Sequence, residues 1–206
     1  MAARRTRGMT GSDLSRTSTT VSTDRAVGIA EQLHHECSVL LELYRKRESL
    51  PPDVSVSDGR LVSVPPPSSQ LDTRDKIWRL HSALLQCRSL MERAIAKEGE
   101  ELDDGRKTEY TTQRRMVKER LSFLIFSTGE LLKAVDGTMG VTPSVEGLEL
   151  DGPSVLFELK VWIYQIYKEV DYWTKTAITT LQALPSVSAK ERVRTRRVRS
   201  LRSARR

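Results

Sequence analysis

The longest apolar-periodic stretch of the chain is DGPSVLFELKVWIYQIYKEVDYWTKTAITTLQAL, residues 151–184. An α-helix turns by about 100° per residue, and on that wheel nine residues form one stripe with the three- and four-residue spacing of a core-facing helix. The stripe consists of Leu159, Trp162, Ile163, Ile166, Val170, Trp173, Ala177, Leu181 and Leu184. This segment therefore predicts the last long helix of a bundle, with Ser154 as its expected N-cap.

Two residues in the first turns of this helix lie outside the stripe. Phe157 is about 160° from the centre of the stripe and Lys160 is about 100° from it. A core built on the stripe leaves an aromatic side chain and a cation exposed at one end of the bundle. Because exposed aromatic groups often mark binding surfaces, we interpret Phe157 and Lys160 as a candidate interaction site.

Three further segments carry helical spacing. The first, 24–48, ends before Pro51 and Pro52, which cannot continue it. The second, 72–98, begins at the N-cap candidate Asp72, and the third follows the acidic link EGEELDDGRK. Their inward stripes are Ala26, Ile29, Ala30, Leu33, Cys37, Leu40, Leu41 and Tyr44; Ile77, Leu80, Leu84, Cys87, Met91 and Ile95; and Val117, Leu121, Leu124, Thr128, Leu131 and Val135.

The lengths of the connections predict how these helices are arranged. A helix of about 25 residues is about 37 Å long, so a connection that returns along it needs at least about a dozen extended residues. The first and last connections have about twenty residues each and can cross over, whereas the middle one is short. We therefore expect one all-α domain, 24–189, that forms a long-chain four-helix bundle with up-up-down-down topology and two long crossover loops.

The positive charge of the chain lies at its ends. Of the formal +7, residues 1–23 contribute +3 and residues 190–206 contribute +8, which leaves −4 for 24–189. The leader 1–23 and the basic tail 190–206 bury too little apolar surface to offset the entropy of ordering, and both are predicted to be disordered. The leader contains no apolar stretch typical of a secretory signal, which favours a cytoplasmic protein or one released by an unconventional route.

The basic tail has two interpretations. It is either a solvated disordered end or a patch that binds polyanions or directs nuclear import. No aromatic residue is interleaved with its arginines to stack on bases. This composition favours disorder with weak binding to heparin-like polyanions.

No motif for catalysis or for a cofactor is found. The sequence lacks a glycine-rich phosphate loop, a nucleophile elbow and a dinucleotide motif, so we expect neither an enzyme nor a cofactor. His34 and His35 point about 100° apart on a helix, and no second pair of ligands has zinc spacing. We therefore expect no metal site.

Four other side chains have alternatives that the sequence leaves open. Cys37 and Cys87 lie on inward stripes and are predicted to be buried free thiols, with a disulfide between the two helices as the alternative. Phe123 and Phe126 lie off the stripe of the third helix. They either pad a broad core or form part of a second exposed apolar patch.

The segment GPSVLFELKVWIYQIYKEVDYWTKTAITTL resembles the last helix of the ciliary neurotrophic factor group of four-helix cytokines, which includes leukaemia inhibitory factor, oncostatin M and cardiotrophin. The resemblance continues in order through LLELYRK, SVSDGRLVSVP, SALLQC and GELL, and covers about residues 25–184. Its most specific element is F-x-x-K at Phe157 and Lys160. In that group this element is the hot spot for the leukaemia inhibitory factor receptor.

The resemblance implies a neurotrophic cytokine, a growth factor in neurogenesis and differentiation that assembles a multi-chain cell-surface receptor and triggers kinase-linked signalling. Phe157 and Lys160 would bind the leukaemia inhibitory factor receptor, and a face of the first and third helices would bind the shared glycoprotein signal-transducing chain. The group has a basic residue three positions after the last-helix tryptophan, where this chain has Thr176 beside Lys175. These two residues are candidates for binding the ciliary neurotrophic factor α-receptor.

The resemblance also implies a localisation. Members of the group without a signal peptide resemble cytosolic proteins that are released to act outside the cell, and the resemblance implies the same for this chain. An intracellular helical scaffold is the alternative. Its basic tail would direct it to the nucleus or to RNA.

Deleting residues 190–206 should weaken retention on heparin, and the difference should shrink as salt rises because exposed charges are screened. The melting temperature should not change, since the tail lies beyond Leu184, the last predicted apolar position. Heparin chromatography and thermal unfolding measure the two effects. Loss of the folded state on truncation would refute this prediction.

Overall fold

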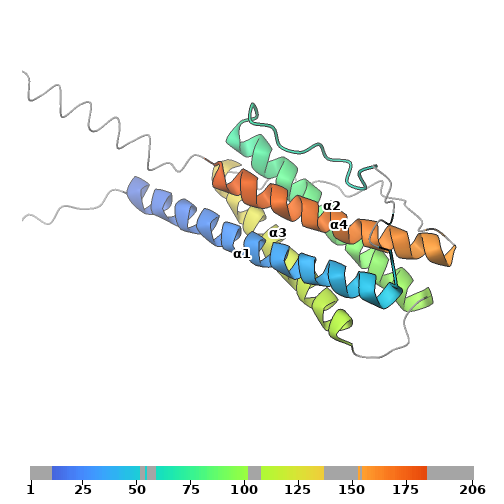
Figure 1. The fold of residues 1–206 in the computed structure, drawn as a ribbon. Coiled ribbons are helices and arrows are strands. Elements are labelled where there is room, and N and C mark those ends of the chain that lie inside the picture. Colours follow the sequence, from blue (N-terminus) through green and yellow to red (C-terminus); the bar gives the residue numbers. More distant parts are fainter. Residues whose placement is uncertain are drawn as a thin grey trace, which may run out of the picture.

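The computed structural model describes residues 11–51, 54, 59–101, 108–136, 153 and 155–184, with side chains from Ser22 onward in the first helix. This part of the chain contains four helices, which are α1 (Gly11–Glu48), α2 (Thr73–Glu101), α3 (Glu109–Asp136) and α4 (Leu156–Gln182). They pack against one another, and the described residues contain no strand (Figure 1). The predicted all-α four-helix bundle is confirmed at this level.

Each helix contacts two of the other three. Both α1 and α2 contact α3 and α4, whereas within the described ranges no Cα atom of α1 comes within 8 Å of one of α2. Three of the neighbouring pairs make their cross-helix contacts in opposite sequence order. These contacts are Glu31–Gln182 and Glu48–Lys160 between α1 and α4, Glu36–Arg120 and Arg47–Tyr110 between α1 and α3, and His81–Thr128 and Glu98–Arg114 between α2 and α3.

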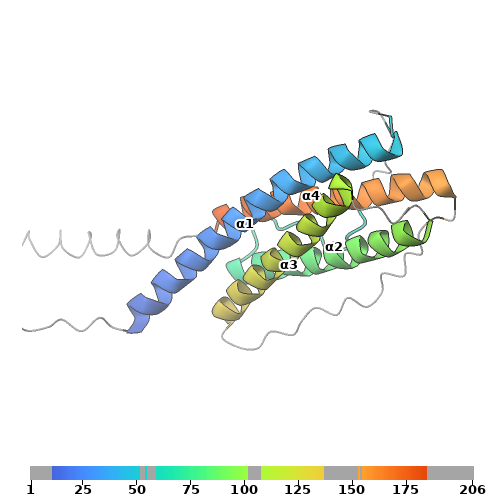
Figure 2. The ribbon, with the colours of Figure 1, turned by 90° about the horizontal axis from the view of Figure 1, so that it is seen from below.

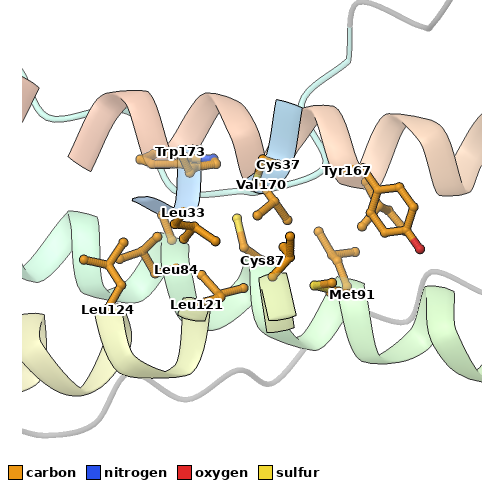
Figure 3. Close-up of a cluster of buried hydrophobic side chains, with 14 of the residues drawn as sticks. Leu33, Cys37, Leu84, Cys87, Met91, Leu121, Leu124, Tyr167, Val170 and Trp173 are labelled. Atoms are coloured by element: carbon orange, nitrogen blue, oxygen red, sulfur yellow. The ribbon is translucent and has the colours of Figure 1, made fainter. Parts of the chain in front are cut away.

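The core is formed by the inward stripes of all four helices. Every predicted stripe residue on α4 is buried, and the last one, Leu184, lies just beyond the helix and packs partly buried at the edge of the core. Leu33, Leu84, Leu121 and Trp173 converge from the four helices (Figure 3). Truncating a buried tryptophan of this kind costs about 3 to 5 kcal/mol. Val135 is a wrong core prediction, because it lies in the last turn of α3 and is exposed.

Cys37 and Cys87 are buried free thiols, as predicted (Figure 3). The disulfide alternative is wrong, because α1 and α2 have no Cα pair within 8 Å and a disulfide needs Cα atoms within about 7 Å. Burial raises the pKa of both thiols well above the ordinary value. Both sulfur atoms therefore act as small apolar groups in the core.

Some of the predicted helix ends are wrong. The backbone of 11–23 is helical, so α1 begins before the predicted start at Asp24 and extends beyond the ends of the other helices (Figures 1 and 2). Once a helix is nucleated, each further residue adds one hydrogen bond, and this favours continuation even through a polar segment. The remaining leader residues, 1–10, and the tail 190–206 lie outside the described residues.

The starts of α2 and α4 differ in how well they were predicted. The N–H group of Asp75 donates to Asp72 Oδ1 at 2.7 Å, which confirms Asp72 as the N-cap of α2. The N-cap of α4 is Val155, in an extended conformation and without a side-chain cap. The prediction of Ser154 is therefore wrong by one residue, and Ser154 itself lies outside the described residues.

Among the described helices, none is both long and apolar enough to cross a bilayer.

A buried histidine joins α2 to α3. His81 Nδ1 lies 3.0 Å from Thr128 Oγ1, and a Cβ atom at Gly129 would lie only 3.3 Å from His81 Cε1. The glycine therefore leaves room for the imidazole ring. Burial lowers the pKa of His81 below its ordinary value of 6.5, so the folded protein favours the neutral ring.

Acidification should destabilise the fold through His81. Its contribution is fully present above pH 6.5 and is lost as the pH falls from there towards the lower pKa of the folded state, because only the unfolded chain binds the proton in that window. Urea unfolding between about pH 8 and pH 5 should show a smaller decrease for His81→Gln than for the parent chain. His35→Gln, at an exposed position of α1, is the control and should follow the parent; equal slopes in all three proteins would contradict the prediction.

Candidate functional site

The candidate site lies where α1 ends and α4 begins. Ser49 has a φ of 52°, in the left-handed region, and the N–H group of Leu50 donates to Arg45 O at 3.1 Å. This is the Schellman arrangement that ends a helix, and the buried Leu50 side chain anchors it. The last turn of α1 is thereby held against the bundle.

Three consecutive apolar side chains are exposed at the start of α4. Val155, Leu156 and Phe157 are 54%, 52% and 58% exposed, and we call these three residues the apolar tip. They precede Leu159, the first buried residue of the stripe. The exposure predicted for Phe157 is therefore observed, whereas its role in binding remains a prediction.

Lys160 differs from the sequence prediction. It was expected in solvent, but its side chain is only 24% exposed and Nζ lies 2.9 Å from Glu48 Oε2. The hydroxyl of Tyr44 also donates to Lys160 O at 3.2 Å. A helical wheel cannot reveal this, because a lysine can lay its aliphatic stem along the surface and reach a carboxylate on a neighbouring helix.

A buried polar network lies beneath this end of the bundle and was missed in the sequence. We define the Glu98 network as the fully buried Glu98 together with Arg47, Arg114, Tyr110 and Tyr167. Both arginines pair with the Glu98 carboxylate. The Tyr110 hydroxyl donates to Glu98 Oε2 at 2.7 Å and lies 2.8 Å from the Tyr167 hydroxyl. The network thus joins all four helices.

The negative charge of Glu98 and the positive charges of the two arginines stabilise one another. Burial acts to lower the pKa of Arg47 and of Arg114, but the combined effect of the neighbouring acidic groups, of which Glu98 contributes most, raises both pKa values. Burial also raises the pKa of Tyr110 and of Tyr167, so both hydroxyls stay protonated and can donate. The Arg47 guanidinium lies 4.7 Å from the centroid of the Tyr110 ring, within cation–π range.

A second apolar surface lies on α3. Phe123 is 59% exposed and Phe126 is 68% exposed. Their spacing of three residues places them on the same side of the helix. The interpretation that they pad the core is therefore wrong, and the alternative of an exposed patch describes them.

Lys175 and Thr176 lie on the second half of α4. Lys175 is exposed, and its Nζ lies 2.9 Å from Asp171 Oδ2, while His34 Nδ1 lies 2.7 Å from Oδ1 of the same carboxylate. The Thr176 hydroxyl donates to Tyr172 O at 2.9 Å.

Within the described ranges, no group of three or more potential ligands is arranged to hold a metal ion.

The first connection packs against the middle of α4. The Arg60 guanidinium lies 3.3 Å from the centroid of the Tyr172 ring, and the Gln165 side chain donates to Gly59 O at 3.0 Å. Val62, a residue of the connection, is buried in the core. Lys175 and Thr176 therefore lie beside a surface built from both α4 and the first connection.

No protein-family model matches the chain, and no curated protein matches it significantly.

Replacing Glu98 with glutamine should reduce the free energy of unfolding by about 3 to 5 kcal/mol, because two largely buried arginines lose their counter-charge. Urea unfolding measures the change. The matched control is Glu92→Gln on the same helix. Glu92 is about half exposed and pairs with Lys118 at 3.5 Å, so its loss should cost no more than about 1 kcal/mol. Equal effects of the two substitutions would show that Glu98 is not buried with its partners.

Proposed function

We propose that the protein is a non-catalytic cytokine similar to the ciliary neurotrophic factor group, which acts by bringing receptor chains together around a rigid bundle. The observation that carries the proposal is the exposure of Phe157, which lies outside the buried core stripe at the start of α4. An exposed aromatic side chain on a rigid support is typical of an interface anchor. The F-x-x-K resemblance falls on the same residue.

The proposal includes the up-up-down-down topology with two crossover loops. The opposite sequence order of the contacts of α1 with α3 and α4, and of α2 with α3, supports it. The first connection, 49–72, is long enough to return along a helix, and part of it packs on α4. Most of the last connection, 137–155, lies outside the described residues.

Three surfaces are assigned to three receptor chains in this proposal. The apolar tip and Lys160 bind the leukaemia inhibitory factor receptor, and the face of α1 and α3 that carries Phe123 and Phe126 binds the shared signal transducer. The ciliary neurotrophic factor α-receptor contacts Lys175 and Thr176 beside the first connection. The protein acts outside the cell after release from the cytoplasm.

Phe157→Ala should leave the free energy of unfolding within about 0.5 kcal/mol of the parent, because the side chain is mostly exposed. Binding to the leukaemia inhibitory factor receptor ectodomain should weaken by about 2 kcal/mol or more, because a central aromatic anchor is lost. Urea unfolding and surface plasmon resonance measure the two quantities.

Phe123→Ala is the matched control, since it removes an equally exposed phenylalanine from another helix. It should keep binding to the leukaemia inhibitory factor receptor and weaken binding to the shared signal transducer. A large loss of stability in Phe157→Ala would place Phe157 in the core. Normal binding by a stable Phe157→Ala protein would sink the assignment of this receptor site.

An intracellular scaffold is the competing proposal, and the charge of +8 in residues 190–206 favours it. Purified protein should activate receptor-bearing cells only if the cytokine proposal holds. A protein that binds none of the three receptor ectodomains but binds RNA through its tail would support the scaffold instead.

A further inference from the structure

The last turn of α1 carries a surface pocket that none of the three proposed receptor contacts uses. The pocket has a volume of about 370 Å³ and is lined by Glu42, Arg45, Lys46 and Leu50. It lies one helical turn from Glu48, whose carboxylate pairs with Lys160. The pocket is therefore near the start of α4, where the apolar tip is exposed.

Arg45 has a donor without a partner. Its Nε atom is buried and makes no hydrogen bond, and it is the only such buried side-chain donor or acceptor in the part of the chain that the structure describes. Arg47, two residues later, pairs instead with the carboxylates of Glu48 and Glu98. An unpaired buried donor is unusual, because almost all buried polar groups are hydrogen-bonded. A ligand that accepts this hydrogen bond would satisfy it.

The lining of the pocket indicates which ligand fits. Arg45 and Lys46 supply two positive charges and Glu42 supplies one negative charge, so the pocket carries a single net positive charge. The C-terminal end of a helix also has a partial negative charge. Both features oppose a polyanion with several sulfate groups more than they oppose one carboxylate, which matches the net charge, and Leu50 offers an apolar contact to its methylene groups.

We propose that Arg45 is a binding residue for an Asp or Glu side chain of the protein partner that also covers the apolar tip. This inference rests on the proposed function for the identity of that partner. The guanidinium turns into the pocket and donates from Nε and one Nη atom to the two carboxylate oxygens, in the planar fork that arginine forms with carboxylates. The aromatic anchor and the arginine then act together, as in many interface hot spots.

The first experiment needs no receptor. The full chain, labelled with ¹⁵N, is titrated in separate experiments with acetate, which stands in for the partner carboxylate, with chloride and with inorganic sulfate, all at equal ionic strength. The Nε–Hε signal of Arg45 is assigned by its absence in Arg45→Lys. We expect this signal to shift in a saturable way with acetate but not with chloride, while the exposed Arg88 gives only a linear shift.

Two outcomes of this titration would overturn the proposal. A shift of Arg45 that is linear and equal to that of Arg88 would mean that the pocket does not bind carboxylates. A saturable shift with inorganic sulfate but none with acetate would mean that the pocket binds sulfated or phosphorylated ligands instead.

The second experiment measures binding of full-length variants to the leukaemia inhibitory factor receptor ectodomain. Arg45→Gln should lower the affinity about tenfold, and Arg88→Gln, which removes the same charge from α2, should leave it unchanged. Circular dichroism confirms that both variants remain folded. If Phe157→Ala weakens binding and Arg45→Gln does not, the inference about Arg45 is wrong while the proposed function stands. If no receptor binds the parent chain, the proposed function fails, and with it the assigned partner, whereas the acetate titration still decides whether the pocket takes a carboxylate.

Discussion

The buried carboxylate of Glu98 constrains the whole end of the bundle that carries the candidate site. A carboxylate removed from water is costly unless it is paired and hydrogen-bonded. Its charge is met by Arg47 from α1 and Arg114 from α3, with the Tyr110 hydroxyl as a third donor. These partners come from α1 and α3, whereas Glu98 lies on α2, so the network constrains how the ends of these three helices are placed. Because Arg47 lies in the last turn of α1, its pairing with Glu98 holds that turn in position.

The last turn of α1 also holds the first turns of α4 in place. Glu48 follows Arg47 directly and pairs with Lys160, while Tyr44 donates to the backbone of Lys160. The first turns of α4 are thereby tied to α1 by a side chain and by a carbonyl group. The apolar tip is exposed, but these two contacts hold the helix turn that follows it. A rigid support favours tight binding, because less conformational entropy is lost when a partner covers the aromatic side chain.

The sequence predicted features that depend on one helix and missed those that depend on two. Helical periodicity identified the stripe of α4 and the exposure of Phe157, because both follow from the phase of a single helix. It placed Lys160 in solvent, since its partner Glu48 lies more than a hundred positions away in the sequence. For the same reason the sequence identified Glu98 only as the end of the second helix. Its buried pairing with Arg47 and Arg114 depends on other helices. The N-cap of α4 was missed by one residue, because a proline followed by a serine predicts a start whose position depends on local backbone geometry.

The pairing of Lys160 changes how the two residues of the F-x-x-K element can contribute to binding. A partner carboxylate that reaches Lys160 has to displace Glu48 or share the ammonium group with it, and exchanging one ion pair for another yields little net free energy. Glu48 would still have Arg47 at 3.3 Å after such an exchange, so the exchange is feasible but not strongly favourable. Phe157 has no such competition, because covering its exposed ring removes apolar surface from water. In this protein the aromatic residue should therefore supply most of the affinity of the tip, and the lysine should supply mainly its orientation.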